Sequence, residues 1–150
     1  MEKYDSAPAT YDHISNVRSF LQQITEDLLI RGYTHDQSKL MNPEKEIFDE
    51  FTPKLKNTTY GSDEYKQYLE EMGGALKHHY EFNRHHPEHF EKGIAGMNLV
   101  DMMEMLCDWK AATKRHADGD IVRSINQNQK RFGYSDELKQ ILLNTVNWLI

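Results

Sequence analysis

Apolar residues recur at intervals of three and four along most of this 150-residue chain, and this spacing limits what the chain can fold into. Such spacing places apolar side chains on one face of an α-helix. No stretch shows the strict alternation of apolar and polar residues that indicates a half-buried strand. The pattern therefore predicts an all-α protein of about six helices, as in the stretch with Ile14, Val17, Leu21, Ile24 and Leu28.

Capping and helix-breaking residues divide the chain into these helices. Thr10, Ser62, Asn98 and Ser135 are good N-caps, and Gly32 is a natural C-terminal stop. Asn42–Pro43 favours the start of the second helix. The third helix contains Gly73–Gly74, a weak point that permits close packing or a bend, and residues 84–96 are predicted to form an irregular loop. The remaining helices are expected from 98 to about 114, from about 121 to 132, and after 135.

The chain has the length of one ordinary domain, and it contains neither an internal repeat nor a low-complexity linker. We therefore expect a single domain over residues 1–150. Apolar residues make up 38% and charged residues 28%, with a mean hydropathy of −0.80. The net charge of −6 disfavours a basic groove for duplex nucleic acid.

No apolar run reaches the length of a membrane span, and the first ten residues lack a hydrophobic signal region. Cys107 is the only cysteine, which excludes a disulfide framework and a cysteine-based zinc finger. These features predict a cytoplasmic protein without a membrane partner, in the host cytoplasm if a phage encodes it. The size is compatible with a homodimer.

Histidine is the residue type that points to chemistry. The chain has eight histidines, and six of them follow Lys77. Neutral imidazole and carboxylate groups together are suitable ligands for Mn, Fe, Co, Ni or Zn. Candidate ligands lie on successive predicted helices or beside them: His13, the adjacent His35 and Asp36, the adjacent His78 and His79, and Asp101.

The helical geometry separates some of these candidates. His78 and His79 point about 100° apart on a helix, so both cannot face one point equally. We prefer His79, because it continues the face of Met72 and Leu76. His85 and His86 lie in the predicted loop, where they are either ligands or solvated side chains. Glu44, Lys45 and Glu46 are expected to form a solvated face.

The order His, His-Asp and Asp on successive helices resembles the HD-domain superfamily of metal-dependent phosphohydrolases. The stretch Thr34-His35-Asp36-Gln37-Ser38-Lys39 is similar to the HDxGK variant of its motif, with Ser38 in place of Gly. Residues 77–81, KHHYE, look like the HHE segment of the branch that cleaves cyclic dinucleotides, but the Gly-Tyr-Pro element of that branch is absent. The chain also resembles a family of small uncharacterised HD-like proteins of phages and bacteria. The resemblance covers about residues 11–116, and the predicted C-terminal helices of residues 120–150 follow it.

The resemblance implies one or two divalent transition metals per chain, with the fold of an HD domain. It implies that His13, His35, Asp36 and Asp101 hold the first metal. Asp36 would bridge to a second metal, which His79 would also hold. His78, His85 or His86 would complete the coordination of this second metal.

The implied activity is metal-dependent hydrolysis of a nucleotide or another small phosphorylated metabolite by metal-activated water. Asp36 and Lys39 would act in the catalytic site, with Lys39 neutralising phosphate charge or orienting the water. Many nucleotidase relatives carry Glu near the position of Lys39, so the general acid would be Glu104 or a histidine of residues 78–89. Four cations are candidate phosphate clamps: Arg84, Lys110, Lys114 and Arg115.

Two other functions remain open at this point. One is an HD-type di-iron oxygenase, which uses the same ligand types and requires two redox-active irons. The other is a non-catalytic ligand-binding module, such as a phage accessory protein. The absence of a recognisable acid near Lys39 keeps this second alternative open.

Overall fold

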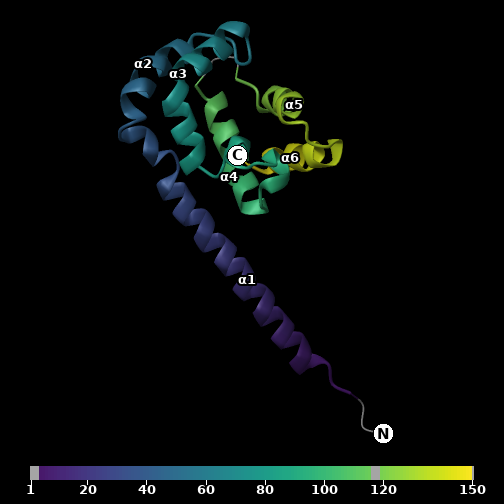
Figure 1. Cartoon of the computed structure of the whole chain (residues 1–150). Coiled ribbons are helices and arrows are strands. Elements are labelled where there is room, and N and C mark those ends of the chain that lie inside the picture. The colour runs from purple at the N-terminus through teal and green to yellow at the C-terminus, as the bar shows by residue number, and fades with distance from the viewer. Residues whose placement is uncertain (1–3, 116–118, 150) are drawn as a thin grey trace. The chain divides into compact units, whose positions relative to one another are not determined.

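The computed structural model describes residues 4–115 and 119–149, and these residues form helices joined by turns and loops, without any strand (Figure 1). The all-α prediction is confirmed, including the number of helices. The α-helices are α1 (Ala7–Thr34), α2 (Lys45–Lys56), α3 (Asp63–Phe82), α4 (Leu99–Thr113), α5 (Ile121–Phe132) and α6 (Asp136–Trp148). Three short 3-10 segments are η1 (Gln37–Leu40), η2 (Pro87–His89) and η3 (Gly93–Gly96).

The chain divides into two compact units, Met1–Thr34 and His35–Ile150. Helix α1 makes up the first unit. The predicted stop of this helix at Gly32 is wrong, because the helix continues to Thr34, whose hydroxyl donates a hydrogen bond to the Ile30 carbonyl at 3.1 Å. The second unit begins at His35 and contains every other helix.

The apolar core of the second unit lies between α4, α5 and α6, with η3 at its edge. Helix α5 is well delimited, because Asp120 caps its N-terminus and Gly133 ends it with a left-handed φ of 68°. The Tyr134 hydroxyl donates to the Ile125 carbonyl at 2.6 Å and ties the α5–α6 turn to the core. The buried core residues are Ile94, Met105, Leu106, Ile125, Tyr134, Leu142 and Val146.

Helices α2 and α3 pack against each other on the other side of α4 (Figure 1). Helix α2 begins at Lys45, slightly later than the Asn42–Pro43 start that the sequence favours. Helix α3 is kinked at Gly73, where φ is 44° and ψ is −113°. Only glycine adopts such angles readily, so the predicted bend at Gly73–Gly74 is confirmed.

The segment between α3 and α4 winds through η2 and η3, within the irregular loop predicted for residues 84–96. Helix α4 then starts with a reciprocal capping box between Asn98 and Asp101. None of the helices in the described parts of the chain combines the length and the apolarity needed to cross a membrane. His116, one of the eight histidines, lies outside the described residues.

Candidate metal centre

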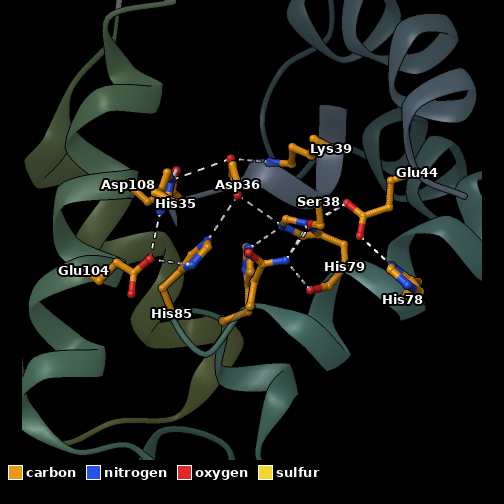
Figure 2. Close-up of polar contacts among 12 residues, drawn as sticks. His35, Asp36, Ser38, Lys39, Glu44, His78, His79, His85, Glu104 and Asp108 are labelled. Carbon is orange, nitrogen blue, oxygen red and sulfur yellow. Dashed lines mark hydrogen bonds and ion pairs between the residues drawn. The ribbon is translucent and has the colours of Figure 1, made fainter. Parts of the chain in front are cut away.

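Asp36 lies at the centre of a group of polar side chains in the second unit. It precedes η1 with a φ of 57° and a ψ of 11°, which is left-handed backbone. Asp tolerates this conformation better than most residues, but it remains uncommon and is frequent at functional sites. Its Oδ2 accepts a hydrogen bond from the Lys39 ammonium at 2.6 Å, while Oδ1 is buried and faces histidines (Figure 2).

Three histidines surround Asp36, and together with it they form what we call the His/Asp cluster: Asp36, His79, His85 and His86. His79 comes from the last turn of α3, and the other two come from the loop that follows it. His79 and His85 are each only 1% exposed. Each of the four residues offers one ligand atom, and these atoms all lie within 4.8 Å of one another.

The separations within the cluster fit a single metal ion. His79 Nε2 lies 2.9 Å from His86 Nε2 and 3.4 Å from Asp36 Oδ1, and His85 Nε2 lies 3.5 Å from the same oxygen. Metal–ligand bonds of about 2.0–2.2 Å place neighbouring ligand atoms about 2.8–3.6 Å apart in octahedral or tetrahedral sites. The cluster therefore already has the spacing of a coordination sphere.

Two carboxylates orient cluster histidines by contacting the Nδ1 atoms, on the side of each ring that faces away from the cluster. Glu44 accepts a hydrogen bond from His79 Nδ1 at 2.9 Å, and Glu104 is 3.1 Å from His85 Nδ1 (Figure 2). When Nδ1 carries the proton, Nε2 of a neutral imidazole is a lone-pair acceptor directed at the cluster. Carboxylate–histidine pairs of this kind are the usual outer support of a metal-ligating imidazole.

This orientation leaves acceptor atoms facing one another. Asp36 Oδ1 and His85 Nε2 are buried and have no hydrogen-bond partner among the residues that the structure describes. Buried polar atoms of this kind require a compensating proton, donor or cation. A cation between Asp36, His79, His85 and His86 would satisfy all four acceptors together.

The charge states in the metal-free protein follow from burial and neighbouring charges. Burial, assisted by the neighbouring His85 and His79, lowers the pKa of His86 to about 2, so this imidazole is neutral. Burial also lowers the pKa of His79. For His85, burial opposes protonation, but the neighbouring carboxylates of Asp36 and Glu104 outweigh it and raise the pKa.

Three further ligand-type side chains, which we call the flanking group, lie beside the cluster: His35, Glu104 and Asp108. His35 and Glu104 offer ligand atoms within 4.8 Å of one another together with His85, and His35 and Asp108 do so together with Asp36. His35 Nδ1 is 3.0 Å from Glu104, and His35 Nε2 is 3.6 Å from both Asp36 Oδ2 and Asp108 Oδ1. The neighbouring carboxylates of Asp108 and Glu104 raise the pKa of His35 to about 10. Glu104 and Asp108 are one turn apart on α4, which fixes the pair in space.

Asp101 does not belong to either set, although the sequence analysis predicts it as a metal ligand. Its fully buried carboxylate pairs with Arg84 through two contacts, at 3.1 and 2.9 Å, and accepts from the Asn98 backbone at 3.0 Å. The donors that an inward carboxylate requires are thus supplied by the protein itself. The same contacts occupy Arg84, a predicted phosphate clamp.

The other predicted residues fall into three situations. Lys110 donates to the carbonyls of Val146 and Leu149 at the end of α6, and Lys114 is exposed, whereas Arg115 lines a cavity beside the cluster. His78 contacts Glu44 at 2.7 Å and does not enter the cluster. His13 lies on α1 in the first unit, and its role as a ligand stays a prediction.

Glu44 is the residue that the sequence analysis misplaces. It is expected on a solvated face, but the structure buries it completely. The burial is explained by three donors, because His78, His79 and the Ser38 hydroxyl all hydrogen-bond to its carboxylate (Figure 2). Asp108 was also not singled out as a ligand, although it shares a helical face with Asp101.

We expect Glu44→Gln to weaken metal binding about 10–100-fold, which is typical of losing an outer-shell partner of a histidine ligand. The amide keeps the size of the side chain but removes the charge that holds the two histidine protons. Competition titration with a chelator measures the affinity. Glu46→Gln, which changes an exposed glutamate at the start of the same helix, is the matched control and should leave the affinity unaltered. Equal affinities for both variants would remove Glu44 from the site.

The fold and the cluster define an all-α protein with a candidate metal centre built from three histidines and an aspartate. The chain belongs to DUF5662, a family of unknown function, whose family model matches residues 2–148. No curated protein and no solved structure matches the chain. The function therefore has to be argued from the geometry of the site.

Proposed function

We propose that this protein is a metal-dependent phosphohydrolase that acts on a small organic phosphate. The observation that carries the proposal is the set of four inward-facing acceptors in the His/Asp cluster, two of whose atoms are buried without a hydrogen-bond partner in the described part of the chain. Such a donor set suits Mn, Fe, Co, Ni or Zn. The resemblance of the His35-Asp36 and His79 segments to HD-domain phosphohydrolases favours hydrolysis.

A bound divalent ion would supply a water of lowered pKa and a Lewis acid for a phosphoryl oxygen. The protein residues then position the substrate and its charge. The Lys39 ammonium lies beside Asp36 and 5.0 Å from the centre of the Phe48 ring, at the border of a cavity of about 960 Å³. A cation at this point can neutralise a phosphate oxygen next to the cluster.

Asp108 is the best placed group for proton transfer on the substrate side. It lines the same cavity as Lys39, together with His79 and His86, and its carboxylate is next to the His35 ring. Glu104, proposed from the sequence as the general acid, instead contacts the Nδ1 atoms of His35 and His85. We therefore assign Glu104 to orienting the histidines and Asp108 to exchanging a proton with the leaving group or water.

The metal content of the purified protein tests the proposal. We expect about one or two equivalents of a transition metal by elemental analysis of protein purified without a nickel column. His86→Ala should weaken metal binding by about 100-fold, because one of four ligands is lost from a site worth about 10–16 kcal/mol in total. The metal-loaded wild type should release phosphate from organic phosphates, and this variant should not.

His89→Ala is the matched control for His86→Ala. His89 belongs to the same loop, but its ring contacts the Tyr80 carbonyl at 2.9 Å and lies outside the cluster. The control should keep both metal and activity. If the wild type binds no metal after reconstitution, the proposal is wrong. If it binds metal tightly but hydrolyses nothing, a non-catalytic binding module is the better description.

The flanking group supports a second candidate, a di-iron oxygenase. His35, Asp36 and Asp108 offer ligand atoms within 4.8 Å of one another, and Asp36 is shared with the His/Asp cluster. A carboxylate that is shared by two metal ions is also compatible with a pair of irons. This alternative requires two irons per chain and oxygen uptake with a substrate. One equivalent of a redox-inactive metal such as zinc in an active enzyme would exclude it.

A further inference from the structure

The cavity beside the His/Asp cluster has walls of opposite character. Its volume is about 960 Å³, and His79, His86 and Lys39 line the end next to the cluster. Helices α2 and α3 contribute an apolar wall that includes Phe48, Leu69 and Met72. A cavity of this size is at the upper end of the range for small-molecule sites.

The opposite wall is the polar face of α5. Arg123, Ser124, Gln127, Asn128 and Arg131 all line the cavity, and they follow one another at the one-, three- and four-residue intervals that form one helical stripe. A helix of a small all-α protein normally directs its apolar side inward. Helix α5 also does so, since Ile125 is fully buried in the core. The stripe is thus a second, hydrogen-bonding surface directed at the cavity.

Part of this stripe is held rigidly by its own contacts. The Tyr60 hydroxyl donates to Asn128 Oδ1 at 2.8 Å, and Arg131 donates to Tyr60 at 3.3 Å and to Glu88 at 2.6 Å. Gln127 differs from these residues. It is half-buried in the cavity wall, and its amide makes no hydrogen bond to another residue in the described part of the chain.

We infer that this cavity is the substrate chamber and that the α5 stripe, with Gln127 as its free amide, determines which organic phosphate is accepted. The substrate class is an organic phosphate whose other part is a planar ring that carries hydrogen-bond groups along its edge. The ring would lie between the apolar wall and α5, with its phosphate at Lys39 and the cluster. The hydrolysis of the bound phosphate rests on the proposed function. The binding of the ring in the cavity does not depend on it.

Binding of matched probes tests the inference. Phenyl phosphate has a planar ring without hydrogen-bond groups, and the four ribonucleoside 5′-monophosphates add such groups to a similar ring. Calorimetry on the metal-loaded protein should show at least one of the four binding about tenfold or more tightly than phenyl phosphate. Gln127→Leu should reduce this preference by about 3–10-fold, as expected for one hydrogen bond.

Asn126→Leu is the control on the same helix. The Asn126 side chain is exposed, donates to the Val122 carbonyl at 2.9 Å and does not line the cavity, so this variant should keep the wild-type preference. Equal binding of all five probes, no binding of any, or a preference unaltered by Gln127→Leu would each overturn the inference. Phosphate release, measured separately, tests the hydrolase proposal. Selective, Gln127-dependent binding without release would support the chamber and contradict the hydrolase.

Discussion

Asp36→Asn should abolish stoichiometric metal binding while leaving the fold intact. Asp36 contributes the only carboxylate of the His/Asp cluster, and its Oδ1 is the oxygen that His79 and His85 both approach. Replacing it with a neutral amide removes both a ligand and the negative charge, so we expect affinity to fall by more than the approximately 100-fold expected for one of four ligands. Elemental analysis after dialysis against a weak chelator measures the loss.

The choice of asparagine makes this test clean. Asp36 has left-handed backbone, and Asn adopts that conformation about as readily as Asp, whereas Ala would add strain. Circular dichroism and thermal unfolding should therefore match those of the metal-free wild type. A variant that keeps a full equivalent of metal would show that the cluster is not the metal site.

Asp101→Ala should have the opposite profile, with lower stability and unchanged metal content. The substitution removes the carboxylate that caps α4 and pairs with Arg84. A lost cap costs about 1 kcal/mol. The charge-assisted hydrogen bonds to Arg84, which is about half exposed at 48%, should add no more than a similar amount. We expect the free energy of unfolding to fall by about 2 kcal/mol, or a decrease in Tm of about 4–8 °C.

Denaturant unfolding of the metal-free protein measures this free energy. The stability of Asp101→Asn should lie between those of the wild type and Asp101→Ala, because its amide oxygen can still accept a hydrogen bond from the Asn98 backbone. Elemental analysis of the same samples provides the second readout. Loss of metal from a variant that unfolds normally would restore Asp101 as a ligand, as the resemblance to HD domains implies.

The helices of this protein could be predicted well from the sequence because their signals are local. Apolar spacing defines each helix, and caps such as Ser62 and Asn98 fix where several begin. Gly32 misleads because a glycine near a helix end permits a stop without imposing one. Here the helix continues past it to Thr34.

The candidate site was predictable only in part, because it depends on contacts between distant segments. The helical face of Leu76 favours His79 over His78, and the structure brings His79 into the cluster. The order of residues favours Asp101, yet Asp108 lies two turns further along the same face of α4 and is the residue beside His35. Which of the two reaches the site depends on how the segment of η2 and η3 positions α4.

Glu44 was not predictable, because its role depends on histidines more than thirty residues away. A glutamate between Pro43 and Lys45, at the start of a helix, has the local pattern of a solvated residue. The only sequence signal for it is indirect: adjacent histidines at 78 and 79 leave two ring protons that some buried acceptor has to receive.

The carboxylates behind the histidines also affect how an ion would be captured. Glu44 and Glu104 fix the rings of His79 and His85 in the folded protein, so the entropy of ordering these ligands is lost during folding. Metal binding then needs little rearrangement of the chain, which lowers its thermodynamic cost and leaves the metal-free and metal-loaded proteins nearly superimposable. Preorganisation of this kind makes the centre a ready receptor rather than a site that the ion has to assemble.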